Sequence, residues 1–260
     1  GLILLTFFAE AYGWVYTALI IPGYLAPVWI VHPWAGCVVV VEAVLTYFIV
    51  RALSDHLSRF GLWDDFFGRD RFFAFVLVSI AVRLICETWL FPTIGQAVVT
   101  TLGVTFDVDN RLHSVGFVIV PLLANVFWKP GIRRGFLPAA FVMASTYVVV
   151  RYVLIPYTNY SVARFDLLYE DVARGLDSGP KVYIMLVTGA WMASRVNLKY
   201  GWDMGGILVP TLLMLAWTTP TKILATAVEA TLIAVVAAFI LRQRFLESTT
   251  IEGPRRTLLV

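Results

Sequence analysis

One pattern of proline and tryptophan occurs three times in this chain, each time within an apolar stretch. A proline is followed seven positions later by a tryptophan, and a second proline follows that tryptophan within four positions. Proline lacks the backbone N–H that a helix uses and clashes with the preceding turn. The pattern predicts apolar segments broken at Pro22 with Gly23, at Pro121 and at Pro210. Repeated interruptions of this kind point to the functional centre of a membrane protein.

The composition excludes an ordinary soluble domain. Hydrophobic residues make up 60% of the 260 residues and charged residues 14%, with a mean hydropathy of +0.81. We therefore expect an all-α membrane protein with about seven transmembrane helices and proline-broken repeats. A helix needs about 20 residues to cross the hydrocarbon core. This length predicts spans at 35–53, 72–93, 136–156 and 222–241, and a further one at 181–196. The stretches 115–128 and 204–217 are too short to distinguish a span from a re-entrant segment.

The repeats also suggest how the chain is organised. We expect one integral membrane domain over 1–260, in which 1–156 holds two repeats, 157–180 is a polar connection and 181–260 holds the third repeat. The chain starts with neither methionine nor a basic segment. We therefore expect a piece of a longer polypeptide.

Arginines between the first two repeats predict the side of the membrane. Arg51, Arg59, Arg69 and Arg71 cluster there, and such clusters mark cytoplasmic loops. Leu57, Phe60, Trp63 and Phe67 recur at helical spacing among these charges, which predicts an interfacial amphipathic helix over 54–71. Lys129, Arg133 and Arg134 are expected on the same cytoplasmic side.

Ionisable residues within the apolar stretches are the candidate functional groups. Glu42 and Glu229 follow corresponding prolines of the first and last repeats, Arg83 and Glu87 lie four apart, and Glu10 precedes the first broken segment. A charge at a span centre costs about 2.5–3.5 kcal/mol on insertion scales, so such residues are paired or serve a function. The carboxylates either brace the N–H groups exposed at the breaks or handle protons or substrate, and the sequence leaves both open.

The sequence lacks the motifs of a self-sufficient enzyme. It has no phosphate-binding loop, no nucleophile elbow and no zinc-protease motif, and its three histidines lie on separate connections without metal spacing. We therefore expect no catalytic residues, no cofactor, no metal site and no nucleic-acid partner.

Several stretches resemble the PgsC/CapC family of membrane subunits of poly-γ-glutamate synthesis. The likeness covers about 1–156 and includes Phe8-Ala9-Glu10, Ile21-Pro22-Gly23-Tyr24-Leu25, Leu45-Thr46-Tyr47, Phe67-Gly68-Arg69 and the pair Arg83 and Glu87. The remaining third adds another repeat. The greater length resembles a seven-transmembrane module that is usually fused to an inactive transglutaminase-like domain.

This resemblance implies a non-catalytic partner of an ATP-dependent amide ligase. The ligase would be cytoplasmic, of the ATP-grasp or Mur-ligase-like kind, and would act on glutamate-type substrates. The chain would then be a scaffold or conduit in the bacterial inner membrane for an anionic polymer or peptide, with a fused or separate transglutaminase-like domain. Docking would use Arg59, Trp63, Arg69 and Arg71. The alternatives are a proton-coupled secondary transporter using Glu10, Glu42 and Glu229, and a membrane anchor of a sensor protein.

Overall fold

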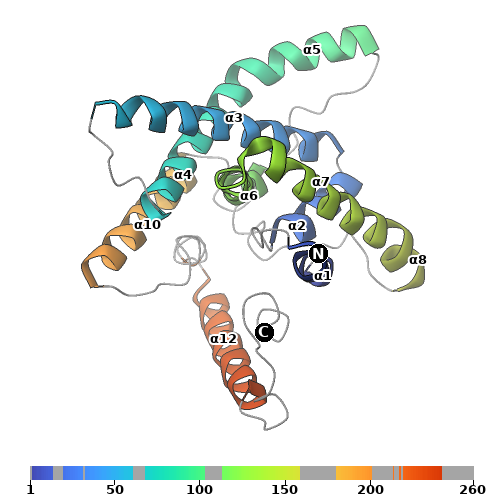
Figure 1. Ribbon diagram of the computed structural model, residues 1–260, viewed down its shortest axis with the longest axis vertical. Helices are drawn as coiled ribbons and strands as arrows, with labels where there is room; N and C mark the ends of the chain where they lie inside the picture. The colour runs from blue at the N-terminus through green and yellow to red at the C-terminus, as the bar shows by residue number, and fades with distance from the viewer. Residues whose placement is uncertain are drawn as a thin grey trace.

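All regular elements in the described part of the chain are helices, which confirms the predicted all-α class. The computed structural model describes residues 2–13, 20–31, 33–60, 68–102, 113–158, 180–200 and 219–241, together with Leu213 and Trp217. The helices are shown in Figure 1. In chain order they are α1 (Leu2–Tyr12), α2 (Ile20–Val31), α3 (Pro33–Ser58), α4 (Gly68–Ile85), the π-helical turn η1 (Cys86–Leu90), α5 (Phe91–Leu102), α6 (His113–Val126), α7 (Gly131–Val149), the π-helical turn η2 (Val150–Leu154), α8 (Ile155–Tyr157), α10 (Pro180–Tyr200) and α12 (Pro220–Leu241).

Four helical segments among the described residues are long and apolar enough to cross a membrane. They are Pro33–Ser58, Arg71–Gly95, Gly131–Tyr157 and Pro220–Ile240. These segments confirm the four spans that length and hydropathy predict. The further span predicted at 181–196 lies within α10, but its apolar part, Tyr183–Met192, is shorter than a span. Of the two undecided stretches, 115–128 falls mainly in the 14-residue α6, and 204–217 lies almost wholly outside the described residues.

The second proline of each repeat marks the start of a long helix. Pro33 and Pro220 are the first residues of α3 and α12, and Pro130 directly precedes α7. A proline fits the first turn of a helix because a backbone N–H there would have no carbonyl within the helix to bond. The first proline of the first repeat, Pro22, also lies in the opening turn of its helix, α2. Each of the first two repeats is therefore a short helix, a proline turn and a long helix.

The predicted break at Pro121 is wrong. Pro121 lies inside α6, which continues for five more residues to Val126, and the chain turns only at 127–130. A proline removes one hydrogen bond and bends a helix, but packing on neighbouring helices can hold the two parts together. Pro121 is buried where α6 packs against α3 and α4, which provides that support. Pro210 lies outside the described residues.

The interfacial helix predicted over 54–71 is also wrong in its described part, and residues 61–67 lie outside the described residues. Residues up to Ser58 continue α3, a turn follows at 59–60, and Gly68 begins α4. Nothing in Ser54-Asp55-His56-Leu57 interrupts a helix. The ion pair between Arg51 and Asp55 supports the last turns of α3 instead. At the polar end of a long span, the apolar residues had the same spacing as they would have in a separate amphipathic helix.

The first two repeats pack reciprocally. The short helix α2 lies against the long helix α7 of the second repeat, and the short helix α6 lies against the long helix α3 of the first. Figure 1 shows α3 and α7 running in opposite directions. Residues from both repeats and from α4 form one apolar core, which includes Leu25, Ala43, Phe75, Leu123 and Phe127. This is the arrangement of an inverted repeat, whose interface is where membrane proteins commonly place their sites.

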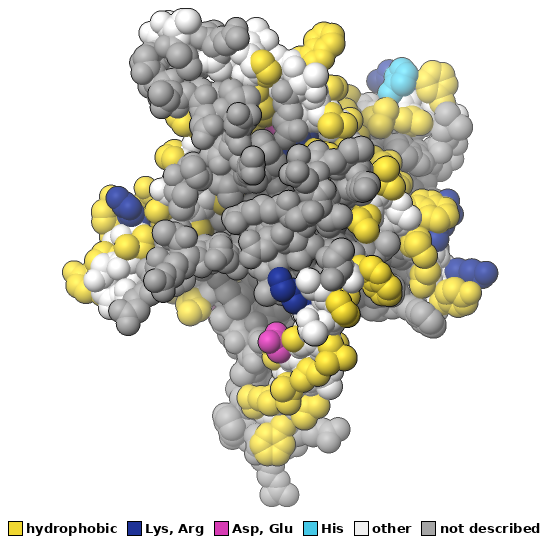
Figure 2. Space-filling view, turned by 180° about the vertical axis from the view of Figure 1, so that it is seen from behind, with side chains coloured by type: hydrophobic (Ala, Val, Ile, Leu, Met, Phe, Trp, Pro, Cys, Tyr) yellow, Lys and Arg dark blue, Asp and Glu magenta, His cyan; other side chains and the backbone are white. Residues whose placement is uncertain are grey.

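The last described helices join this core unequally. Leu186 of α10 packs with Val76 and Ile80 of α4 in a small second cluster. By contrast, α12 extends away from the other labelled helices and carries apolar side chains along its length (Figures 1 and 2). Among the described residues, α12 therefore presents an apolar surface suited to lipid or to another helix.

A glycine lets the two helices of the first repeat approach closely. Gly36, in the first turn of α3, is buried beneath the indole of Trp29 from α2. A Cβ at this position would overlap the side chain of Trp29. The proline turn at Pro33 and the small residue three positions later thus set the angle between α2 and α3.

This contact predicts that Gly36→Ala destabilises the protein. We expect a loss of about 1–3 kcal/mol, because an added methyl in a filled space forces the indole or the backbone to move. Thermal unfolding of the detergent-purified chain measures the loss. Gly23→Ala is the matched control, since nothing lies within 4 Å of a Cβ there. Equal melting temperatures for the two variants would contradict the packing described.

Candidate functional site

The helices α3 and α4 each bury a charged residue and a hydroxyl one turn apart. On α3 these are Glu42, 3% exposed, and Thr46, 0% exposed. On α4 they are Arg83, 4% exposed, and Ser79, 3% exposed. The two helices pack together, and Figure 1 shows α4 crossing α3. Two helices that pack against each other therefore each bury a residue that can carry charge, an acidic one on α3 and a basic one on α4.

One of the buried polar side chains makes a hydrogen bond within its own helix, and two others make none to the described residues. The Ser79 hydroxyl donates to the Val76 carbonyl at 2.8 Å, which returns its bond to its own helix. The buried Thr46 hydroxyl and the side-chain oxygen of Asn125 on α6 make no hydrogen bond to the described residues. Since buried polar atoms are nearly always hydrogen-bonded, these two can bind water or a polar ligand.

Glu42 and Arg83 carry the largest energetic cost of the site. A buried charge is tolerated only when an opposite charge and hydrogen bonds compensate its lost hydration. Both residues make polar or electrostatic contacts. Because α3 packs on α4, we expect the carboxylate and the guanidinium to stabilise one another across this interface.

A second cluster surrounds the tryptophan of the middle repeat. The guanidinium carbons of Arg51 and Arg71 each lie 5.4 Å from the centre of the Trp128 ring, a cation–π distance. The rings of Phe75 and Tyr47 lie 5.6 Å and 6.5 Å from it, edge to face. Trp128 therefore joins the second half of α3, the first half of α4 and the turn after α6.

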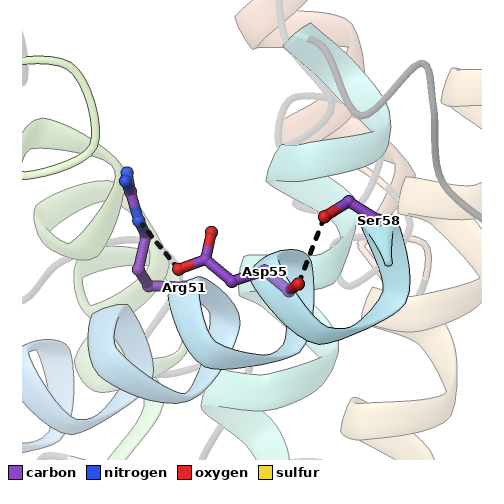
Figure 3. A network of polar contacts seen from close by, with 3 residues as sticks. All are labelled: Arg51, Asp55 and Ser58. Carbon is purple, nitrogen blue, oxygen red and sulfur yellow. Dashed lines mark hydrogen bonds and ion pairs between the residues drawn. The ribbon is translucent and has the colours of Figure 1, made fainter. Parts of the chain in front are cut away.

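The polar end of α3 extends from this cluster. Arg51 Nε lies 3.6 Å from a carboxylate oxygen of Asp55, and the Ser58 hydroxyl donates to the Asp55 carbonyl at 3.2 Å (Figure 3). Arg59 follows and is exposed. Both side chains of the ion pair are about half exposed or more, so the pair adds little stability. These residues instead form a charged surface at the end of the helix.

The Trp128 contacts place two basic segments at the same end of the bundle. Lys129, Arg133 and Arg134 follow Trp128 directly and are exposed, so they lie at the end where Arg51 and Arg59 are found. Positive charge gathered at one end is the pattern of a cytoplasmic face. It supports the prediction that both segments lie on one side of the membrane.

The structure separates the other candidate residues. Glu10 is exposed on α1 and Glu229 is exposed on α12, whereas Glu42 is buried in α3. The three carboxylates are therefore not gathered into one site. Glu87 lies in η1 and Arg69 in the first turn of α4, and the side chains of both lie outside the described residues, as do Trp63 and Pro210.

The polar residues Thr46, Ser79 and Asn125 were not predicted as site residues. Thr46 belongs to the phrase Thr46-Tyr47-Phe48-Ile49-Val50-Arg51, which returns as Thr146-Tyr147-Val148-Val149-Val150-Arg151, and both threonines are buried. This repetition was a usable signal. Ser79 lies one turn before Arg83, which was a weaker signal. The signal at Asn125 was the weakest, because an amide in an apolar helix is compatible with many surroundings.

Comparison with known proteins now identifies the family. A family model described as capsule biosynthesis CapC matches residues 1–136 and 188–260. The chain belongs to the capsule-biosynthesis CapC family. The PGA biosynthesis protein CapC of Bacillus subtilis (strain 168) is 27% identical over 150 residues, which cover 58% of this chain and 88% of that relative. No solved structure matches the chain.

These matches confirm the resemblance and extend it. The resemblance covers about 1–156, whereas the family model also matches 188–260, which include the third repeat. The third repeat is therefore part of the family match and not solely an addition to it. A fused transglutaminase-like domain stays a prediction.

The burial of Glu42 and Arg83 predicts an energetic coupling that a double-mutant cycle can measure. We expect Glu42→Gln and Arg83→Gln each to destabilise the protein by about 3–5 kcal/mol, because each leaves the other charge buried without its counter-charge. The double variant should lose clearly less than the sum of the two. Thermal and denaturant unfolding of the purified chain give these values. Glu229→Gln, at an exposed carboxylate, is the control and should have little effect; additive losses would show that the charges are independent.

Proposed function

We propose that this chain is a non-catalytic membrane subunit that works with a cytoplasmic ATP-dependent amide ligase in making or exporting poly-γ-glutamate or a similar anionic polymer. The observation that carries the proposal is membership of the CapC family, together with the likeness to a PGA biosynthesis protein over most of that relative's length. The four candidate spans support a place in the bilayer, for which we propose the bacterial inner membrane.

The basic end of the bundle supports a role in docking. A ligase that joins glutamate units holds an acidic product. A positively charged surface attracts a partner of this kind. Arg59 is exposed at the end of α3, and the exposed residues Lys129 and Arg133 lie at the same end. We propose that this end receives the ligase, with Trp63 contributing from the connection between α3 and α4 and Arg69 from the first turn of α4. Arg71 is half-buried against Trp128, so its role is to fix this end of the bundle.

The interior of the bundle supports a role beyond anchoring. Arg83 is buried on α4, the Thr46 hydroxyl on α3 and the side-chain oxygen of Asn125 on α6, and these three helices pack against one another. A carboxylate that leaves water needs polar groups and a positive charge along its path. We propose that these groups line the path of the polymer's carboxylates and that Glu42 holds Arg83 in place between passages.

Co-purification tests the docking proposal. The tagged chain, extracted from its own host in mild detergent, should carry glutamate-dependent ATP hydrolysis with it. Reversing two charges in Arg59→Glu/Arg69→Glu should lower the recovered activity on the order of tenfold, because the basic surface steers and holds an acidic partner.

The matched control is Arg151→Glu. Arg151 is exposed in η2, twenty residues beyond the start of α7 and so about 30 Å further along the helix. It should leave the recovered ligase activity unchanged. Wild-type protein that carries no ligase, or equal losses in both variants, would contradict docking at this end.

One observation favours the transporter as a second candidate, namely the deep burial of Glu42. A carboxylate in the bilayer interior is a common proton-coupling group. In that case, uptake of a labelled glutamate peptide into proteoliposomes should follow an imposed pH gradient and disappear in Glu42→Gln. Uptake that persists in Glu42→Gln, or that ignores the gradient, would dismiss this candidate.

A further inference from the structure

A cavity of about 230 Å³ lies between α1, α2, α6 and α7, apart from the polar cluster. Its walls are made almost entirely of apolar side chains and backbone. Leu5 and Phe8 line it from α1, Pro22 from α2, Leu123 from α6, and Ala139 and Met143 from α7. An apolar cavity of about 150 Å³ already stays dry and binds benzene. This larger one is therefore suited to an apolar ligand.

The cavity lies along one face of α7. Its lining residues on this helix run from Arg134 to Met143, nine positions or about 13 Å along the axis. An extended alkyl chain can lie along such a face.

The walls offer an alkyl chain few polar groups. Pro22, Pro130 and Pro138 line the cavity and have no backbone N–H to present to it. The rings of Phe8 and Phe141 meet edge to face at 5.2 Å and hold α1 against α7. The cavity is therefore bounded by fixed apolar surfaces.

Among the described residues that line the cavity, Arg134 is the charged one, and it lies at the basic end of the bundle. Arg134 is exposed, so the cavity reaches the surface where this guanidinium lies. The first turn of α7 contains no acidic residue, and Arg133 beside Arg134 is also exposed. The cytoplasmic leaflet is rich in anionic lipids, which basic residues at that surface attract. An anionic group at the mouth and an alkyl chain inside match these features.

We infer that this cavity holds an acyl chain of an anionic membrane lipid, with the lipid's charged head group at Arg134. An alkyl chain with an anionic group could also come from a free fatty acid. The inference does not depend on the proposed function, because lipid binding can be measured without a ligase.

Native mass spectrometry of the detergent-purified full chain tests the inference. The probes are phosphatidylglycerol, phosphatidylcholine, palmitate and glycerol phosphate, each added to delipidated protein. We expect phosphatidylglycerol to be retained on the order of tenfold better than phosphatidylcholine, and glycerol phosphate not to displace it. Displacement by palmitate at equal concentration would identify a fatty acid as the ligand and overturn the lipid assignment.

Two variants, each with a control, test the binding of the acyl chain and of the head group separately. Ala139→Phe fills the cavity and should abolish retention of phosphatidylglycerol, whereas Ala144→Phe, on the exposed side of α7, should not. Arg134→Gln should remove the preference for phosphatidylglycerol over phosphatidylcholine, whereas Arg133→Gln, which does not line the cavity, should keep it. Unchanged retention in Ala139→Phe, or equal retention of both lipids by the wild type, would overturn the inference. If Ala139→Phe does not fold, the Arg134 and Arg133 pair decides.

Discussion

The packing of each short repeat helix against the long helix of the other copy is the contact on which the rest of the structure depends. Neither copy can bury its apolar surfaces alone, since α2 needs α7 and α6 needs α3. The exchange places α6 beside α3 and α4, which brings Trp128 to Arg51 and Arg71 of those helices. It also leaves space between α1, α2, α6 and α7, where the apolar cavity lies. Both candidate sites therefore follow from one packing arrangement.

The fold class and the long spans could be predicted because the bilayer imposes a minimum length and hydropathy on any helix that crosses it. The effect of each proline on its helix could not be predicted from the sequence. Pro121 and Pro22 occupy corresponding positions in the repeat, yet one lies within a helix and the other near its start. A proline's effect depends on what packs against the helix, and sequence spacing does not contain that information. The ends of α3 and α4 were misjudged for a related reason, because a polar helix end and an interfacial helix have the same periodicity.

The two repeat carboxylates show the same limit. Glu42 and Glu229 follow corresponding prolines, but the first is buried in the shared core and the second is exposed on α12. The first two copies supply packing partners for each other, whereas the described part of the third copy has no such counterpart. Residues at equivalent positions of two repeats can thus lie in different surroundings in the structure. Depth of burial is what distinguishes a structural or functional charge from one that faces the outside.

The position of Glu42 also has a consequence for how the protein is made. During synthesis α3 enters the bilayer before α4 exists, so the carboxylate arrives earlier than the guanidinium of Arg83. The lone carboxylate raises the free energy of that intermediate by a few kcal/mol. Insertion of α3 and α4 together, as one hairpin, avoids this intermediate. The connection between them is short, from the end of α3 at Ser58 to the start of α4 at Gly68, and suits such joint entry. Pairing of Glu42 with Arg83 thus couples the insertion of α3 to the insertion of α4.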